Sequence, residues 1–494
     1  MASGMIQKPD IDDEVLRRTA SRCRERGIVI PTFAEMRDPA LVPEAICSRL
    51  RDVGMQDADP VNLFRISWRN EPVESGGLYN SGNWVEFPSE LTGVDARIIG
   101  LVGKWFPTGS HKVGAAFGCL VPRLVTGQFD PDSQRAVWPS TGNFCRGGAF
   151  DCALLGCRAI GILPEEMSAE RFEWLKSIGA EIIATPGCES NVKEIYDKCW
   201  ELRRTREDCV IFNQFEELGN PVWHYHVTGT AVAETFARVT ADNPTSSRLA
   251  AWVSATGSAG TIAAGDYLRT IHPDIRVVAT EALQCPTLYQ CGFGGHRIEG
   301  IGDKHVPWVH NLRNTDVVAA IDDEQCLALM RLFNEPVGRD YLASIGVGDA
   351  VIDCFDLLGV SSICNLVAAI KTARLFDMGG RDVILLPLTD SMDLYGSRME
   401  EQRARHGGYD ASAAARHFGR YIEGIGPDYI RELGYGDRKA LHNLKYFTWV
   451  EQQGRTVEEL NQLWDRDFWV EAFAQVDVWD EQIRTFNKAV GGSA

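Results

Sequence analysis

The stretch Leu-Ala-Ala-Trp-Val-Ser-Ala-Thr-Gly-Ser-Ala-Gly-Thr-Ile, at residues 249–262, decides the fold class of the chain. The apolar run at 249–253 predicts a buried strand, and a loop of small residues separates it from a helix predicted over 261–271. Small residues in such a loop let backbone N–H groups approach an anion at the positive end of the helix. The stretch therefore indicates a βα unit with room for a phosphate group, although a plain tight turn has the same pattern.

Elements of the same kind lie on both sides of this stretch. Short apolar runs predict strands at 96–102, 136–138, 158–163, 181–184, 210–213, 276–280 and 383–386. Segments of helical period predict helices at 147–155, 169–178, 191–203, 351–358 and 362–376. This alternation predicts an α/β protein with mostly parallel sheets in two lobes. We expect four parts: an N-terminal segment that joins the large lobe (1–105), a small lobe (106–234), a large lobe (235–398) and a helical C-terminal extension (399–494).

Composition and charge argue against several classes of function. The 494 residues carry 50 Lys plus Arg against 68 Asp plus Glu, a net charge of −18, which disfavours nucleic acid and anionic membranes as partners. None of the 14 cysteines forms a Cys-x-x-Cys pair, so a zinc ribbon is not expected. The sequence has neither an apolar signal segment nor an apolar stretch of membrane-spanning length, and we expect a cytoplasmic location.

A second stretch, Pro-Thr-Gly-Ser-His-Lys-Val-Gly-Ala-Ala-Phe at residues 107–117, places a lysine among small and apolar residues. Lys112 falls in the first turn of the predicted helix, where it is poorly solvated. Desolvation lowers the pKa of an amine and makes it a nucleophile that can hold a carbonyl group as a Schiff base. The alternative is an exposed lysine at a helix start, which the helix dipole disfavours.

A third stretch, Pro-Ser-Thr-Gly-Asn-Phe-Cys-Arg at residues 139–146, lies between a predicted strand and a predicted helix. Ligands of α/β proteins often bind at this edge of a sheet. The hydroxyls of Ser140 and Thr141, the backbone N–H of Gly142 and the amide of Asn143 could together hold a carboxylate. An ordinary capped turn would have the same composition.

These three segments, in this order and at this spacing, resemble the pyridoxal-phosphate enzymes of fold type II, the group of cysteine synthase, cystathionine β-synthase, threonine dehydratase and the tryptophan synthase β-subunit. The resemblance covers residues 98–398 and implies bound pyridoxal 5'-phosphate, a small amino-acid substrate and a homodimer. It puts Lys112 on the Schiff-base lysine and Asn143 on the residue that bonds the phenolic oxygen of the cofactor. His111 corresponds to the histidine that touches the phosphate in the tryptophan synthase β-subunit.

The remaining site residues follow from the same resemblance. It implies a phosphate loop made by Thr256, Gly257, Ser258, Ala259, Gly260 and Thr261, with Ala259 where the family usually has glycine. It implies that the substrate carboxylate is bound by Ser140, Thr141, Gly142, Asn143 and Gln214. Gly300 falls in the Gly-Ile-Gly segment that lines the cofactor ring. Ser391 falls on the residue that faces the pyridine nitrogen, with two extra residues after Pro387.

Departures from the family pattern concern the substrate. Phe144-Cys145-Arg146 replaces a small Thr-Gly of cysteine synthase, which puts the same amino-acid substrate in doubt. We hypothesise that Arg146 binds a second acidic group on the substrate, with a surface or phosphate-side charge as the alternative.

Two further polar segments could contribute to the site. Asp303 and His305 could line the pocket mouth, although loop polarity accounts for them as well. His224-Tyr225-His226 is predicted to place two imidazoles on one face of a strand. No carboxylate or cysteine falls at ligand spacing there, so no metal site is expected.

The resemblance also implies a reaction class. A neutral serine at the ring nitrogen makes the cofactor a weaker electron sink, which favours elimination over transamination. We therefore expect β-elimination or β-replacement on a small Ser-, Cys- or Thr-like amino acid, by an enzyme similar to cysteine synthase or cystathionine β-synthase. A deaminating dehydratase or racemase of the same fold is the alternative. A non-catalytic pyridoxal-phosphate-binding protein would not need the carboxylate turn, and a nicotinamide oxidoreductase would need a Gly-x-Gly-x-x-Gly motif.

Overall fold

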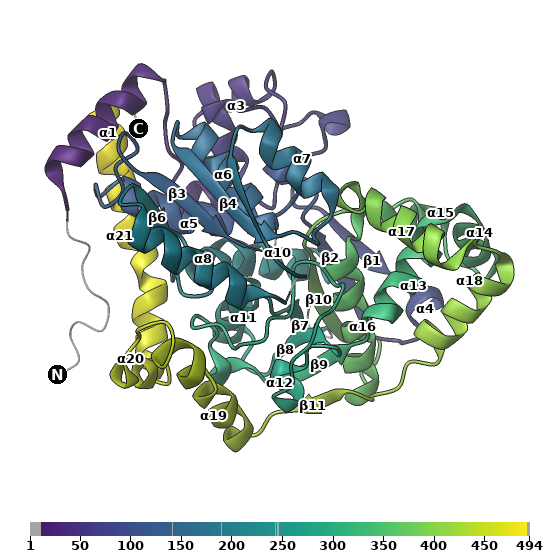
Figure 1. The fold of residues 1–494 in the computed structure, drawn as a ribbon. Coiled ribbons are helices and arrows are strands. Elements are labelled where there is room, and N and C mark those ends of the chain that lie inside the picture. Colours follow the sequence, from purple (N-terminus) through teal and green to yellow (C-terminus); the bar gives the residue numbers. More distant parts are fainter. Residues whose placement is uncertain (1–10, 141, 189, 243, 245–246, 492–494) are drawn as a thin grey trace.

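Two β-sheets lie at the centres of two lobes (Figure 1). The computed structural model describes residues 11–140, 142–188, 190–242, 244 and 247–491. The smaller sheet has four strands in the order β5-β4-β3-β6, and all of its pairings are parallel. Its strands are β3 (Arg135–Pro139), β4 (Arg158–Pro164), β5 (Glu181–Thr185) and β6 (Cys209–Ile211).

The larger sheet has seven strands in the order β1-β2-β10-β7-β8-β9-β11. The five inner strands are parallel, and the edge strands β1 and β11 pair antiparallel with their neighbours. Its strands are β1 (Trp84–Phe87), β2 (Arg97–Val102), β7 (Arg248–Ala255), β8 (Arg276–Ala282), β9 (Val317–Ile321), β10 (Asp382–Leu388) and β11 (Ile430–Glu432). The segment before residue 105 therefore supplies two strands to this sheet.

Both faces of the larger sheet are covered, as the sequence of β10 shows. All seven residues of this strand are buried. Val383 and Leu385 belong to one hydrophobic core, while Ile384 and Leu386 belong to a second core that includes helix α16 (Val360–Leu375). A strand buried on both faces has a continuous apolar sequence rather than an alternating one, which is why this strand was predictable.

The helices follow the strands in the order expected of βα units. Those before and within the small lobe are α1 (Asp13–Glu25), α2 (Phe33–Arg37), α3 (Glu44–Leu50), α4 (Ser89–Thr92), α5 (Lys112–Leu124), α6 (Asn143–Leu154), α7 (Ala169–Ser177), α8 (Val192–Thr205) and α9 (Gly219–Trp223). Those of the large lobe are α10 (Gly229–Val239), α11 (Ala264–Ile271), α12 (Thr287–Gln290), α13 (Asp323–Asn334), α14 (Pro336–Ser344), α15 (Asp349–Ile352) and α16. The helix predicted over 351–358 is instead α15 followed by a short 3-10 turn at Phe355–Leu357.

One secondary-structure prediction is wrong. The segment His224-Tyr225-His226 is not a strand: it lies in a wide helical turn, His224–Thr228, that joins α9 to α10. The N–H of Gly229 donates to the carbonyl of His224, which closes this turn. Aromatic and β-branched residues favour strands locally, but packing against α2, α10 and α11 decides the conformation here. The two imidazoles therefore do not share a strand face.

The C-terminal extension is helical, as predicted, but it also contributes the edge strand β11. Its helices are α17 (Gly396–His406), α18 (Ala411–Phe418), α19 (Tyr435–Asn443), α20 (Val457–Gln462) and the long α21 (Arg466–Val490). Figure 1 shows α21 running beside α1. Asp480 on α21 accepts hydrogen bonds from the backbone N–H groups of Phe33 (2.7 Å) and Ala34 (3.2 Å). Within the described ranges, no helix is long and apolar enough to cross a membrane.

Candidate active site

The amine of Lys112 lies where segments of both lobes meet. Lys112 is the first residue of α5, and its Nζ donates hydrogen bonds to Ser258 Oγ at 2.8 Å and to Gln214 Oε1 at 3.3 Å. Ser258 follows β7 in the large lobe, whereas Gln214 follows β6 in the small lobe. Three separately predicted segments are therefore in direct contact. A narrow cavity opens among them, lined by Lys112, Ser140, Asn143, Phe144, Gln214, Phe215, Gly257, Ser258, Gly300, Asp303 and Thr389.

The predicted phosphate loop connects β7 to α11. Thr256 anchors its start, because its N–H (2.9 Å) and its Oγ1 (3.2 Å) both donate to the carbonyl of Thr280 on β8. Thr261 begins the 3-10 turn (Thr261–Ala263) that leads into α11. Backbone N–H groups at the start of such a helix favour an anion.

The middle of the loop is held by Asn220. Asn220 Nδ2 donates to Ser258 Oγ at 3.1 Å, and a Cβ added to Gly260 would lie 1.9 Å from Asn220 Oδ1. Gly257 packs against the carbonyl of Gly300, which a Cβ would approach to 2.9 Å. Ala259 adopts φ +58°, a left-handed conformation that an alanine disfavours by roughly 1–2 kcal/mol. The position where the family usually has glycine thus keeps the glycine-like backbone.

The predicted carboxylate turn lies between β3 and α6. Ser140 Oγ accepts hydrogen bonds from the N–H of Gly142 (3.1 Å) and from Gln214 Nε2 (3.4 Å). Gly142 has φ +143°, and a side chain there would meet Arg171 Cδ at 2.4 Å. Asn143 begins α6, so the positive end of that helix faces the turn. Thr141 lies outside the described residues.

A buried charged cluster, which the sequence did not indicate, fixes Asn143. Asn143 Nδ2 donates to Asp390 Oδ2 at 2.6 Å, and Tyr395 Oη donates to the same oxygen at 3.0 Å. Arg171 lies 3.6 Å from that oxygen and pairs with Glu299. Burial raises the pKa of Asp390 above its ordinary value. These residues are far apart in the chain, so no local motif could have revealed the cluster.

In the segment after β10, the side chain at the cavity is Thr389 and not the expected Ser391. Thr389, the first residue beyond the strand, lines the cavity with Lys112. Ser391 is buried at the start of the next 3-10 turn, Met392–Leu394, and is not among the described residues that line the cavity. β10 continues through Pro387 to Leu388 in register with β2, so Thr389 is the first residue beyond the strand.

Asp303 also lines the cavity. It lies in the loop that contains Gly300, and its side chain is only 5% exposed. Its Oδ2 has no hydrogen-bond partner in the described part of the chain, and burial raises the pKa of its carboxyl well above the ordinary value. Its neighbour His305 instead accepts or donates a hydrogen bond with Tyr196 Oη at 2.9 Å. Of the two loop residues singled out in the sequence, Asp303 is the one at the cavity.

His111 immediately precedes Lys112 and is the N-cap residue of α5. It is fully buried. Its ring packs against the ring of His224, with the ring centroids 4.9 Å apart, and against that of Trp68, with the centroids 5.5 Å apart. Burial, assisted by the charge of Lys112, lowers the pKa of His111 to about 3, so its imidazole is neutral. Neither ring nitrogen has a hydrogen-bond partner among residues that the structure describes. An N–H of this ring therefore remains available for an acceptor such as a phosphate oxygen.

Arg146 does not lie at the cavity. Its Nη2 donates to the carbonyl of Thr108 at 2.8 Å, and its guanidinium lies over the ring of Trp174. Burial and the nearby charge of Arg171 lower the pKa of Arg146 to about 10. It is 3% exposed and does not belong to the described lining of the cavity. This position does not support the hypothesis that Arg146 binds a second acidic group of the substrate.

The side chains around this cavity fit pyridoxal 5'-phosphate. They supply a primary amine, a loop of backbone N–H groups at a helix start and a hydroxyl at the end of β10. The unpartnered imidazole of His111 adjoins Lys112 in the chain but is not part of the described cavity lining. Across the described residues, no group of three or more His, Cys, Asp or Glu side chains could hold a metal ion. The donor set therefore suits an organic cofactor that carries a carbonyl and a phosphate.

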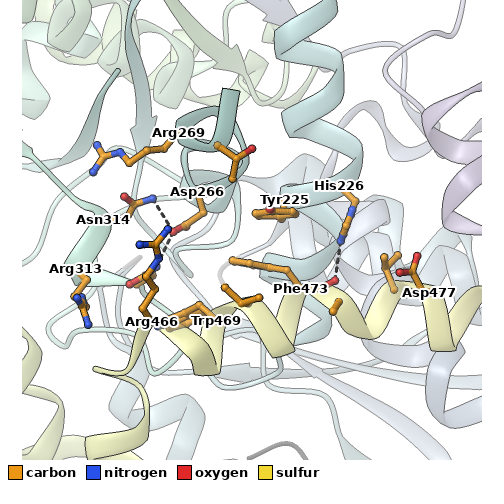
Figure 2. A pocket seen from close by; sticks show the side chains of 15 residues that line it. Tyr225, His226, Asp266, Arg269, Arg313, Asn314, Arg466, Trp469, Phe473 and Asp477 are labelled. Carbon is orange, nitrogen blue, oxygen red and sulfur yellow. Dashed lines mark hydrogen bonds between the residues drawn. The ribbon is translucent and has the colours of Figure 1, made fainter. Parts of the chain in front are cut away.

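A larger cavity of about 510 Å³ lies elsewhere, between α21 and α11 (Figure 2). Figure 2 shows Tyr225 and Phe473 stacked face to face, with ring centroids 3.9 Å apart. Asp266 accepts hydrogen bonds from the amides of Asn311 (2.6 Å) and Asn314 (2.7 Å). Its lining and that of the Lys112 cavity share no described residue, so the predicted chemistry does not involve it.

Comparisons with known proteins concern the same residues. A family model described as pyridoxal-phosphate dependent enzyme matches residues 105–339. A cysteine synthase of Staphylococcus aureus (strain Mu50 / ATCC 700699) is 30% identical over 284 residues, which cover 57% of this chain and 82% of that protein. The cystathionine beta-synthase of Saccharomyces cerevisiae is 26% identical over 387 residues, covering 76% of this chain and 72% of that protein.

A solved structure is similar in fold. The cysteine synthase of Entamoeba histolytica superposes with a TM-score of 0.55 at 19% identity, over 68% of this chain and 92% of that one.

Proposed function

The chain belongs to the pyridoxal-phosphate-dependent enzymes of fold type II, in the group similar to cysteine synthase and cystathionine beta-synthase, and we propose that it replaces a group on the β carbon of a small serine-derived amino acid. The observation that carries this proposal is the position of Lys112 Nζ, 2.8 Å from Ser258 Oγ in the loop that precedes α11. A primary amine beside an anion-binding loop is the arrangement that holds a cofactor with one carbonyl and one phosphate.

The loop Thr256–Thr261 would hold the phosphate of the cofactor, and His111 would donate a hydrogen bond to it. Backbone N–H groups of the loop and the positive end of the following helix favour the anion. His111 is neutral because it is buried, so it donates one N–H without adding a positive charge beside Lys112. The amide of Asn143, held by Asp390, would bond the phenolic oxygen of the cofactor.

Thr389 would provide a hydroxyl to the ring nitrogen of the cofactor. It follows β10 directly and lines the cavity. Ser391 instead is the N-cap residue of the 3-10 turn at Met392–Leu394 and is not part of the described lining. A hydroxyl is a neutral partner for that nitrogen, so the argument from a weak electron sink holds with threonine as it does with serine.

The substrate carboxylate is bound at the positive end of α6. Ser140, Gly142 and Asn143 supply a hydroxyl, a backbone N–H and an amide there, and Gln214 reaches the same turn through its 3.4 Å contact with Ser140. Bound pyridoxal phosphate withdraws electrons from the α carbon of an amino acid and permits loss of the α proton and of a group on the β carbon. With the cofactor bound, Lys112 Nζ would accept the α proton of the substrate. Phe144 and Phe215 give the cavity apolar walls that exclude water.

Product analysis tests this proposal. We expect O-acetyl-L-serine with sulfide, or L-serine with homocysteine, to give cysteine or a thioether, with little keto acid. Pyruvate and ammonia alone would indicate a deaminating lyase, and a D-amino acid would indicate a racemase. Failure of every amino acid to react, with the cofactor bound, would indicate a non-catalytic carrier. Lys112→Ala is the control, because it removes the amine and should abolish each reaction.

Assembly and location extend the proposal. We propose a homodimer, as the family resemblance implies, and light scattering of the purified protein measures it directly. We also propose the cytoplasm as its location. All 14 cysteines lie in the described part of the chain and all are free thiols, which suits a reducing compartment.

A further inference from the structure

We propose that Asp303 is the acid that protonates the leaving group at the β carbon of the substrate. This inference rests on the proposed function and adds a residue to it. Asp303 lines the same cavity as Lys112, Gln214 and Ser140, so its carboxyl faces the space in which the substrate is bound. Its Oδ2 is buried and has no hydrogen-bond partner in the described chain. A buried carboxyl with an unpartnered oxygen in a reaction cavity is suited to proton transfer.

The surroundings of Asp303 favour the neutral form of its carboxyl. Burial raises the pKa of this group well above its ordinary value, and the charge of Lys112 on α5 lowers it by less. Tyr196 on α8 and Cys285 after β8 also interact with Asp303. Burial raises the pKa values of both, so both are uncharged at neutral pH. The group therefore keeps its proton to a higher pH than an exposed aspartate does.

The backbone of Asp303 is fixed on both sides. Thr287 Oγ1 donates to the carbonyl of Asp303 at 2.7 Å. His296 Nε2 forms a 2.7 Å hydrogen bond with the carbonyl of the preceding Gly302. These contacts hold the carboxyl at the cavity, as an acid that transfers a proton requires.

The proposed step balances without an oxidant or reductant. The bond between the β carbon and the leaving group breaks, its electron pair goes to the leaving group, and the Asp303 carboxyl supplies the proton. When the replacing nucleophile adds to the β carbon, its proton returns to the Asp303 carboxylate. A hydroxyl leaving group needs this proton, whereas acetate and chloride leave readily as anions.

A series of leaving groups tests the role. The rates of β-bond cleavage would be compared for L-serine, L-cysteine, O-acetyl-L-serine and β-chloro-L-alanine, in the wild type and in Asp303→Asn. General acid catalysis contributes roughly 10²–10⁴-fold, so kcat for L-serine should fall about 100-fold or more. The kcat for O-acetyl-L-serine and β-chloro-L-alanine should change less than about threefold, and KM should change little for all four.

Asp151→Asn is the matched control. Asp151 is also fully buried, and neither of its carboxyl oxygens has a partner among the described residues, but it is absent from the described cavity lining. This variant should leave the ratio of the rates for poor and good leaving groups as in the wild type. An equal loss for all four substrates in Asp303→Asn would contradict the assignment, and so would an unchanged rate for L-serine.

An infrared measurement tests the protonation of Asp303 without turnover. Difference spectra at pH 7 of cofactor-free wild type and Asp303→Asn should contain the carbonyl band of a neutral carboxylic acid. A carboxylate band in its place would overturn the assignment even if the enzyme is active. If the wild type reacts with none of the four amino acids, the proposed function fails and this role fails with it. Turnover by the wild type with an unaltered pattern in Asp303→Asn overturns only the role of Asp303.

Discussion

Asn143 Nδ2 donates a 2.6 Å hydrogen bond to Asp390 Oδ2, and this bond joins the first residue of α6 in the small lobe to the segment after β10 in the large lobe. The carboxylate is in turn held by Tyr395 and lies 3.6 Å from Arg171. The amide proposed to bond the cofactor is therefore oriented by a buried charged cluster that includes residues of both lobes.

Asp390→Asn should weaken cofactor binding. The substitution replaces a charged acceptor by a neutral one, and a hydrogen bond to a charged group is worth about 1.5–3 kcal/mol. We expect an affinity for pyridoxal phosphate at least about tenfold lower, measured by titration of the cofactor-free protein. Asp393→Asn is the control, since that side chain is 64% exposed and pairs with Lys104. Equal affinities of the Asp390→Asn variant and the wild type would contradict the orienting role.

Gln214→Ala should chiefly affect the substrate. Gln214 contacts both Lys112 Nζ (3.3 Å) and Ser140 Oγ (3.4 Å), so it lies between the amine and the carboxylate turn. Loss of one hydrogen bond to a charged carboxylate corresponds to a KM higher by roughly tenfold or more. Steady-state kinetics with O-acetyl-L-serine measure this change. Gln453→Ala is the control, because it removes only an acceptor for Trp200 Nε1 and should leave KM unaltered. If Gln214→Ala also left KM unaltered, the substrate carboxylate would not be bound beside Gln214.

Substitutions of Ala259 should report the left-handed backbone of the phosphate loop. Glycine adopts φ +58° without strain, but it costs roughly 0.5–1 kcal/mol more entropy on folding, so Ala259→Gly should change the free energy of unfolding by no more than about 1 kcal/mol. Ala259→Val should destabilise the protein by more than this, because a β-branched residue is strained at this φ and the site is buried. Urea unfolding measures both variants. A Val variant as stable as the wild type would argue against this loop conformation.

The stability of the protein should depend on the protonation of Asp266. Burial raises the pKa of Asp266 to about 7, whereas the unfolded chain has a value of about 3.9. Between these values the folded state holds a proton that the unfolded state releases. The stability from this group is therefore complete below about pH 4 and is lost as the pH rises towards 7, by at most about 1.4 kcal/mol per pH unit.

Asp266→Asn should remove this contribution. Both Asn311 and Asn314 donate to Asp266 Oδ1, and the amide oxygen of the variant can accept both hydrogen bonds. The free energy of unfolding of the variant, relative to the wild type, should therefore rise from pH 5 to pH 7. Parallel pH profiles for the two proteins in urea unfolding would show that the carboxyl is not protonated in the folded state.

Much of the fold could be predicted because its strands are buried on both faces or lie in regular βα units. β7 and β10 have continuous apolar sequences, and their positions agree with the predicted runs at 249–253 and 383–386. β1, β9 and β11 were not predicted. β11 has three residues in a polar segment and forms only by pairing with β9, whereas β9 was missed although all five of its residues are buried. The strand prediction at His224 failed because tertiary packing outweighed the local preference of its aromatic residues.

The site was predictable where it consists of short contiguous motifs. Lys112, Ser258 and Gln214 were each singled out by their own segment, and they are in contact. Thr389 was not singled out in the sequence, and only its position in the cavity lining draws attention to it. Asp390, Arg171 and Glu299 were missed because their interactions join positions far apart in the chain, with no local pattern. Asp303 was noticed, but only its burial at the cavity distinguishes it from an ordinary polar loop residue.

The central claim is that Lys112 carries the cofactor, and borohydride reduction followed by peptide mapping tests it most directly. Reduction of the protein loaded with pyridoxal phosphate should fix the cofactor covalently to the peptide that contains Lys112. Lys112→Arg, treated in the same way, should give no labelled peptide. A label on any other lysine, or no label on the wild type after loading, would contradict the account.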